Sequence, residues 1–119
     1  MGDFRDLEVW QEAHELTLEI YKLTAELPKS EQFGLVSQIR RAAVSAESNI
    51  VEGDSRYSTK DKIQFFVISR GSIAEVKTQL LIIADLFLAL KGESLKIFEE
   101  YSILEKRLNA FITYHRNKK

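Results

Sequence analysis

Helix-breaking residues are scarce in this chain, and where they occur they divide it into four stretches. The sequence contains one proline and five glycines among 119 residues. Between them, apolar side chains recur every three or four positions, which is the period of one face of an α-helix. No stretch alternates apolar and polar residues as a strand would. We therefore predict helices over residues 6–27, 34–52, 59–90 and 94–116.

The predicted helix ends depend on capping and breaking residues. Asp6 suits the N-cap of the first helix, and Pro28 should end that helix. Gly53 fits the position after the second helix, where a left-handed residue is common. Ser58 opens a sequence that resembles a capping box before the third helix. Gly92 is expected to separate the third helix from the fourth.

The fourth predicted helix indicates how the helices pack. Its apolar and aromatic residues alternate at steps of four and three, as in the seam of a helical bundle. These residues are Ile97, Tyr101, Leu104, Leu108, Phe111 and His115. Four helices with short connections favour an antiparallel, up-down-up-down arrangement. We predict an all-α four-helix bundle in which residues 1–119 form a single domain.

The third predicted helix is apolar on two nearly opposite faces, whereas a four-helix bundle needs to bury only one. One stripe comprises Ile63, Phe66, Val67, Ala74, Leu81, Ala84 and Leu88. The other comprises Phe65, Ile68, Val76, Ile83, Leu86 and Leu90. Because large exposed apolar patches are rare on monomers, we expect a homo-oligomer. The alternative is a monomer with a wide core.

Composition excludes several classes of protein. Without cysteine, the chain has no disulfide, thiolate metal site or cysteine nucleophile. The charged start of the chain is no signal peptide, and the apolar run at residues 80–90 is shorter than the roughly 20 residues that span a bilayer. We expect a cytoplasmic protein that does not enter membranes.

Charge is distributed unevenly, although the net charge is only −1. Residues 1–31 carry 3 basic and 8 acidic groups, a balance of −5. Residues 32–119 carry 14 basic and 10 acidic groups, a balance of +4. A local basic surface is therefore compatible with the sequence, but a strong overall attraction to nucleic acid is not.

Signals for enzymatic chemistry are weak. The sequence has no glycine-rich phosphate loop, no HExxH motif and no Glu-x-x-His pair. The two histidines, His14 and His115, would need a carboxylate to complete a metal site. We favour surface roles for both. We expect a non-enzymatic protein with no catalytic residues, no metal and no cofactor.

Two adjacent arginines, Arg40 and Arg41, are the most informative polar residues. Neighbouring residues on a helix point about 100° apart, so the two cannot face the same neighbour. We assign Arg41 to the bundle seam, paired with Glu75 or Glu52, and leave Arg40 at the surface. The predicted internal polar network contains Arg41, Asn49, Glu52, Arg70 and Glu75. The residues predicted to contact nucleic-acid phosphates are Arg40, Arg41, Arg56 and Lys60.

A series of motifs resembles one family along nearly the whole chain. They are FRDLEVWQ at residues 4–11, EQFGL at 31–35, QIRRAAVS at 38–45, NIVEG at 49–53 and the segment 66–75. The family is the four-helix-bundle proteins encoded by intervening sequences in bacterial 23S ribosomal RNA genes. The chain departs from it at Ala46 and Glu47, where the family often has a proline that would kink the helix.

The resemblance implies a bacterial protein that forms ring-like homo-oligomers, with a pentamer the expected number. It also implies kinship with the accessory variability protein of diversity-generating retroelements. That protein forms a basic pentameric barrel and binds a reverse transcriptase and nucleic acid. The family supplies no established catalytic residues.

These observations lead to two functional hypotheses. The first is a non-enzymatic, homo-oligomeric binding scaffold for RNA or a ribonucleoprotein. The second is a protein–protein adaptor without nucleic-acid contact, in which the apolar surface of the third helix is the interface.

Overall fold

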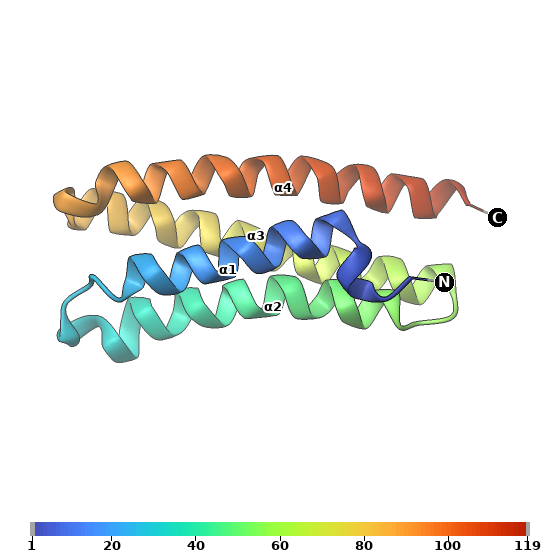
Figure 1. Cartoon of the computed structure of the whole chain (residues 1–119), viewed down its shortest axis with the longest axis horizontal. Coiled ribbons are helices and arrows are strands. Elements are labelled where there is room, and N and C mark those ends of the chain that lie inside the picture. The colour runs from blue at the N-terminus through green and yellow to red at the C-terminus, as the bar shows by residue number, and fades with distance from the viewer. Residues whose placement is uncertain (1, 119) are drawn as a thin grey trace.

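The computed structural model describes residues 2–118 and contains four long α-helices packed side by side (Figure 1). They are α1 (Glu8–Thr24), α2 (Ser37–Asp54), α3 (Thr59–Leu86) and α4 (Lys91–Asn117). Each helix contacts the next along the chain, and α1 also contacts α4, which closes the bundle. The bundle measures 49 × 22 × 20 Å. The predicted all-α, up-down-up-down four-helix bundle is confirmed.

The two ends of the bundle differ in what they contain. The N- and C-termini and the α2–α3 connection lie together at one end in Figure 1. The α1–α2 connection and the α3–α4 turn lie at the other end. Among the described residues, no helix has the length and apolar character needed to cross a membrane.

The first helix is shorter than predicted at both ends. A 3₁₀ turn, η1 (Phe4–Asp6), precedes it, and Asp6 accepts a hydrogen bond from the Asp3 backbone N–H within that turn. Asp3 is the N-cap of η1 and Asp6 completes its capping box, whereas Leu7 occupies the N-cap position of α1 without a side-chain bond. The helix ends at Thr24, before Pro28 is reached. The predictions that Asp6 caps this helix and that Pro28 ends it are wrong.

Two short helical turns lie between α1 and α2. Pro28 precedes the 3₁₀ turn η2 (Lys29–Glu31), which is followed by the π-helical turn η3 (Gln32–Val36). Gly34 departs from helical geometry there, with φ −110° and ψ −107°. From Ser37, α2 continues without interruption through Ala46 and Glu47, where this chain lacks the proline that the resemblance led us to compare.

Gly53 lies inside α2 and is buried, and its φ is not positive. A Cβ atom at this position would lie 2.5 Å from Cε1 of Phe66 and 3.0 Å from the carbonyl oxygen of Lys62. The residue therefore allows α2 and α3 to approach closely. The predicted left-handed helix end at Gly53 is wrong.

The start of α3 follows the prediction, but its end does not. Ser58 accepts a hydrogen bond from the Asp61 backbone N–H and so caps the helix. The helix ends at Leu86, because Phe87 leaves helical geometry (φ −123°, ψ 83°) and packs its side chain on the core. A 3₁₀ turn, η4 (Leu88–Leu90), leads into α4. Gly92 lies within α4, so its predicted role as separator is wrong.

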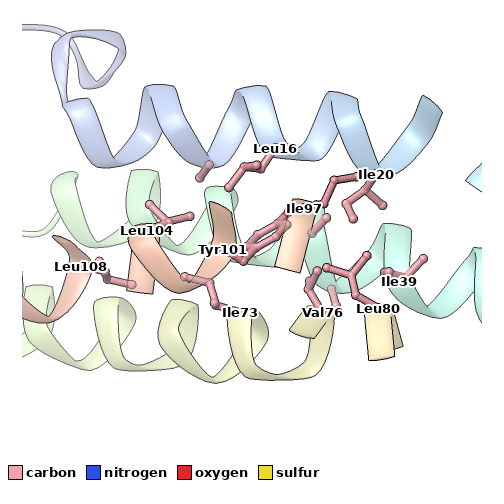
Figure 2. Close-up of a cluster of buried hydrophobic side chains, with 14 of the residues drawn as sticks. Leu16, Ile20, Ile39, Ile73, Val76, Leu80, Ile97, Tyr101, Leu104 and Leu108 are labelled. Carbon is pink, nitrogen blue, oxygen red and sulfur yellow. The ribbon is translucent and has the colours of Figure 1, made fainter. Parts of the chain in front are cut away.

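All four helices contribute to one apolar core (Figure 2). The predicted seam of α4 is confirmed for its first four members, since Ile97, Tyr101, Leu104 and Leu108 are all fully buried. Beyond them Ile112 is the buried residue, while Phe111 and His115, the predicted members, are only partly buried. A straight α-helix drifts against a 3.5-residue repeat, which explains the shift by one position.

The two predicted stripes of α3 are wrong, because one continuous buried face lies between them. Its members are Phe66, Ser69, Ser72, Ile73, Val76, Leu80, Ile83 and Ala84. Ser69 donates a hydrogen bond to the Ala46 carbonyl at 2.6 Å, which satisfies a hydroxyl buried between α2 and α3. Apolar residues remain partly exposed on both sides of this face, namely Ile68, Leu81, Ile82 and Leu86.

Candidate nucleic-acid interface

The four residues predicted to contact phosphates do not form one surface. Arg40 and Arg41 lie in the first turns of α2, whereas Arg56 follows its end and Lys60 begins α3. At 1.5 Å per residue, Arg41 and Arg56 are about 22 Å apart along the bundle. Any shared role in binding would need a ligand that spans almost half of the molecule.

Arg40 is held between α2 and the end of α1. Its Nε donates a hydrogen bond to Oγ1 of Thr24 at 2.8 Å, and Nη2 donates to the Tyr21 carbonyl at 3.3 Å. Its guanidinium lies 4.3 Å from the centre of the Tyr21 ring. A cation at the carbonyl end of a helix is favourable because the helix dipole is negative there. Arg40 thus connects α2 to α1 through its side-chain contacts.

Arg41, in contrast, is exposed on the outer surface of α2. It lines a hollow of 270 Å³ with Glu75 and Gln79 of α3, and no hydrogen bond or ion pair of Arg41 occurs within residues 2–118. The prediction of Arg41 inside and Arg40 outside is therefore reversed. The buried stripe of α2 runs through Ile39 and Ala43, which turns Arg40 towards α1 and Arg41 away from the core.

The predicted internal network of Arg41, Asn49, Glu52, Arg70 and Glu75 is not formed among the described residues. Asn49 donates instead to the carbonyl and hydroxyl oxygens of Ser45 on its own helix. Glu52 pairs with Arg56 at 2.8 Å near the surface.

The last two members of that network also lie apart. Arg70 donates to Oδ1 of Asn109 on α4 at 3.0 Å, and Glu75 is exposed on the side of α3 that faces α2. Separate polar pairs, some within one stretch of chain and some between neighbouring helices, thus replace one connected network. Ser45 and Ser72, whose hydroxyls lie 2.9 Å apart, form another such pair.

Basic and aromatic side chains meet at the α2–α3 connection. The guanidinium of Arg56 lies 4.6 Å from the centre of the Phe65 ring, and Glu52 holds it from the other side. Tyr57, next in the chain, is fully exposed with a relative accessibility of 103%. Lys60 is exposed one turn further on. The Tyr57 ring is therefore presented to solvent in a connection that also carries Arg56 and Lys60.

The C-terminal end of α4 brings further groups to this end of the bundle. His115 packs against Phe66 of α3, with ring centres 5.4 Å apart, and against Tyr114 at 5.3 Å. Tyr114 is 60% exposed, and Arg116 is exposed on a different side of the same helical turn. We call Arg56, Tyr57, Lys60, Tyr114 and Arg116 the basic–aromatic end.

The electrostatics of His115 reflect this environment. Burial lowers its pKa, and the positive charges of Lys118 and Lys62 lower it further, while Asp54 opposes them. Lys62 itself donates to the Asp54 carbonyl at 2.9 Å. Asp54 and Glu52, which pairs with Arg56, oppose part of the positive charge at this end.

Sequence reasoning placed Arg56 and Lys60 at this end but missed Tyr57 and Tyr114. The signal was available, because Tyr57 is flanked by Arg56 and Lys60 in a short polar connection. Aromatic residues between basic ones in a loop are typical of single-strand nucleic-acid contacts, where bases stack on the rings.

The histidines do not gather with carboxylates in a metal-like arrangement. His14 lies on α1, with Nδ1 2.9 Å from Oε2 of Glu47 and its ring stacked on Trp10 at 4.8 Å. His115 lies on the last turns of α4. Within the described part of the chain, no three histidine or acidic side chains are grouped as a metal ion would need.

These features define a four-helix bundle protein with a candidate nucleic-acid interface at one end. Residues 5–110 match the family of the 23S rRNA-intervening sequence protein. The chain belongs to this family, as the sequence motifs predicted.

A solved structure shows the same fold. It is the crystal structure of a protein of unknown function from the S23 ribosomal protein family of Bacteroides thetaiotaomicron. The two chains superpose with a TM-score of 0.77 at 21% identity, over 87% of this chain and 97% of the other. Comparison with curated proteins finds no match.

Proposed function

We propose that this protein is a non-enzymatic, homo-oligomeric scaffold that binds single-stranded RNA, free or in a ribonucleoprotein, at the basic–aromatic end. The observation that carries the proposal is the fully exposed ring of Tyr57 between Arg56 and Lys60. Exposed aromatic rings stack unpaired bases, and adjacent cations contact the phosphates. The chain's near-neutral net charge favours such a local site over a surface that attracts nucleic acid everywhere.

A single site of this size would bind RNA weakly, so the proposed function benefits from an assembly that carries several copies of the site. Several copies acting on one strand raise the overall affinity through effective concentration. The exposed side chains of Ile68, Ile82 and Leu86 on α3 provide apolar surface for contacts between copies. The family resemblance suggests a ring of five, which light scattering would measure directly.

RNA binding is tested by the salt dependence of affinity for a fluorescently labelled, unstructured RNA. Arg56→Ala combined with Lys60→Ala should weaken binding and reduce the slope of log K against log salt by about 1.4, since each phosphate contact on a single strand contributes roughly 0.7. Tyr57→Ala should weaken binding about tenfold with little change of slope, because stacking is worth roughly 1–3 kcal/mol per base.

The matched control removes two exposed lysines elsewhere, with Lys22→Ala and Lys91→Ala. It lowers the net charge equally and should leave binding nearly unchanged. An equal loss in this control, or unchanged binding in the Arg56/Lys60 variant, would contradict the proposal. Loss of RNA binding in the Arg41→Ala variant alone would place the site at the α2–α3 hollow, and this result would also contradict the proposal.

A protein–protein adaptor is the second candidate, favoured by Ile68 at 46% and Leu86 at 64% exposure on α3. An adaptor would lose its partner on Ile68→Ser with Leu86→Ser and would bind no RNA. The RNA proposal requires salt-sensitive RNA binding, so the same titration distinguishes the two.

A further inference from the structure

A long groove runs between α1 and α4, on the side of the bundle away from the α2–α3 pair. It consists of two adjoining hollows of 540 and 290 Å³ that share Glu12 and Arg107. Apolar side chains line much of it, namely Val9, Leu16, Ile103, Ala110 and Phe111. Ile103 is 51% exposed although it projects from a helix of the core, so the groove leaves apolar surface in contact with water.

Carboxylates follow the rims of this groove at regular spacing. On α1 they occur at steps of four, three and four residues, and α4 adds one from the opposite side. They are Glu8, Glu12, Glu15, Glu19 and Glu100.

The groove keeps an excess of negative charge after internal pairing. Among residues 2–118, Arg107 is the single basic residue that lines it, and its Nη1 lies 2.7 Å from Oε1 of Glu12. Glu19 has an exposed neighbour, Lys22, at 4.0 Å. Glu8, Glu15 and Glu100 thus remain available to a ligand, in a groove whose potential repels RNA.

We propose that this groove binds an amphipathic, cationic α-helix of a partner protein. The occupant would place an apolar stripe on Ile103, Ala110 and the partly buried Phe111 of α4, with lysines or arginines facing the carboxylates on both rims. This is helix-in-groove recognition, with flanking charges arranged as at the edges of a coiled-coil seam. From Glu8 to Glu19 the rim extends about 16 Å, the length of three helical turns.

Charge complementarity favours such a partner over a second copy of the chain. The exposed apolar residues on the α2–α3 side are accompanied by Arg41, but also by Glu75. That surface has no excess of positive charge to match the rims of the groove. The proposal is independent of RNA binding, which it assigns to a different surface.

The experiment uses the full chain and a labelled 18-residue peptide helix with leucine in its seam and lysine on both flanks. A second peptide has the same composition with the leucine positions scrambled. We expect saturable binding of the first peptide and at least about tenfold weaker binding of the second, because only the first presents an apolar stripe. Equal binding of both would show simple charge attraction and overturn the proposal.

Two matched pairs of variants locate the site. Glu8→Gln, Glu15→Gln and Glu100→Gln together should weaken binding about tenfold, since three partly exposed ion pairs are lost. Removal of three exposed carboxylates outside the groove, at Glu26, Glu93 and Glu99, should change it less than about twofold. Ile103→Ser should weaken binding, whereas Leu86→Ser on α3 should not.

Three results would overturn the proposal in distinguishable ways. Equal weakening by both carboxylate variants would show nonspecific attraction. Unchanged binding on Ile103→Ser, with the fold verified by circular dichroism, would exclude an apolar contact. A smaller assembly of the carboxylate variant without peptide, seen by light scattering, would show that another copy occupies the groove.

Discussion

At the scale of single residues, Gly53 shows how closely α2 and α3 approach. Its missing side chain leaves room for the ring of Phe66, and an added methyl group would lie 2.5 Å from that ring. The Lys62 carbonyl of the same helix as Phe66, at 3.0 Å, adds a second close contact. The glycine is therefore required by helix packing, although a helix interior otherwise disfavours it.

We predict that Gly53→Ala lowers the free energy of unfolding by about 1–2 kcal/mol. Alanine gains up to about 1 kcal/mol in helix propensity, but overpacking costs about 1–3 kcal/mol. Gly71→Ala is the matched control, because Gly71 lies inside α3 with open space around its Cα. It should stabilise the protein by about 1 kcal/mol. Urea unfolding of both variants measures the difference, and stabilisation by Gly53→Ala would contradict the close approach.

At the scale of helices, local sequence predicted the existence of every long helix and the seam of α4, but not the orientation of each face. Arg40 and Arg41 were separated correctly by helix geometry, yet their roles were reversed. Which of them turns inward depends on where α1 lies relative to α2, and no local pattern contains that information. The same holds for α3, because its buried face is determined by its packing against α2 and α4.

Helix ends were predicted less well for a related reason. Gly53 and Gly92 read as breaks in the sequence, but both lie within helices. The break after α3 occurs at Phe87, where burial of an aromatic side chain outweighs continued helix formation. The exposed tyrosines of the candidate interface also lacked any periodic signal, because surface residues carry no packing constraint.

The contact between α4 and the start of α3 should make stability depend on pH. His115 packs on Phe66, and its pKa is lowered by burial and by nearby cations, so the folded state favours the neutral ring. The unfolded chain takes up this proton more readily as the pH falls below about 6.5. Stability from His115 is therefore complete above that pH and declines below it, towards the lower pKa of the folded state.

Thermal melts at pH 7.5 and 5.5 measure this effect in the wild type and in two variants. His115→Gln should reduce the loss of stability between the two pH values. His14→Gln, on α1, is the control for a histidine outside this contact and should retain the dependence caused by His115. An identical pH dependence in wild type and His115→Gln would contradict the role given to His115.

At the scale of the whole molecule, the acidic groove begins close to the basic–aromatic end. Glu8 lines the groove with Phe111, and Phe111 packs on His115 with ring centres 4.6 Å apart. The negative rim therefore begins at the same end of the bundle as the proposed RNA site, where charge effects extend over about 10 Å at 0.1 M salt. Under the two proposals, RNA at that site would be repelled by the nearest carboxylates of the groove.

We therefore predict that Glu8→Gln tightens RNA binding, although it touches no proposed RNA contact. One unit charge at a separation of about 10 Å in water contributes roughly 0.4 kcal/mol before salt screening, so the gain in affinity is at most about twofold. Glu93→Gln is the matched control, since both glutamates lie in the first turn of a helix but Glu93 is at the opposite end of the bundle. The increase should occur at 50 mM salt and disappear at 0.5 M. An equal increase in Glu93→Gln would show that net charge, and not the position of the groove, determines RNA affinity.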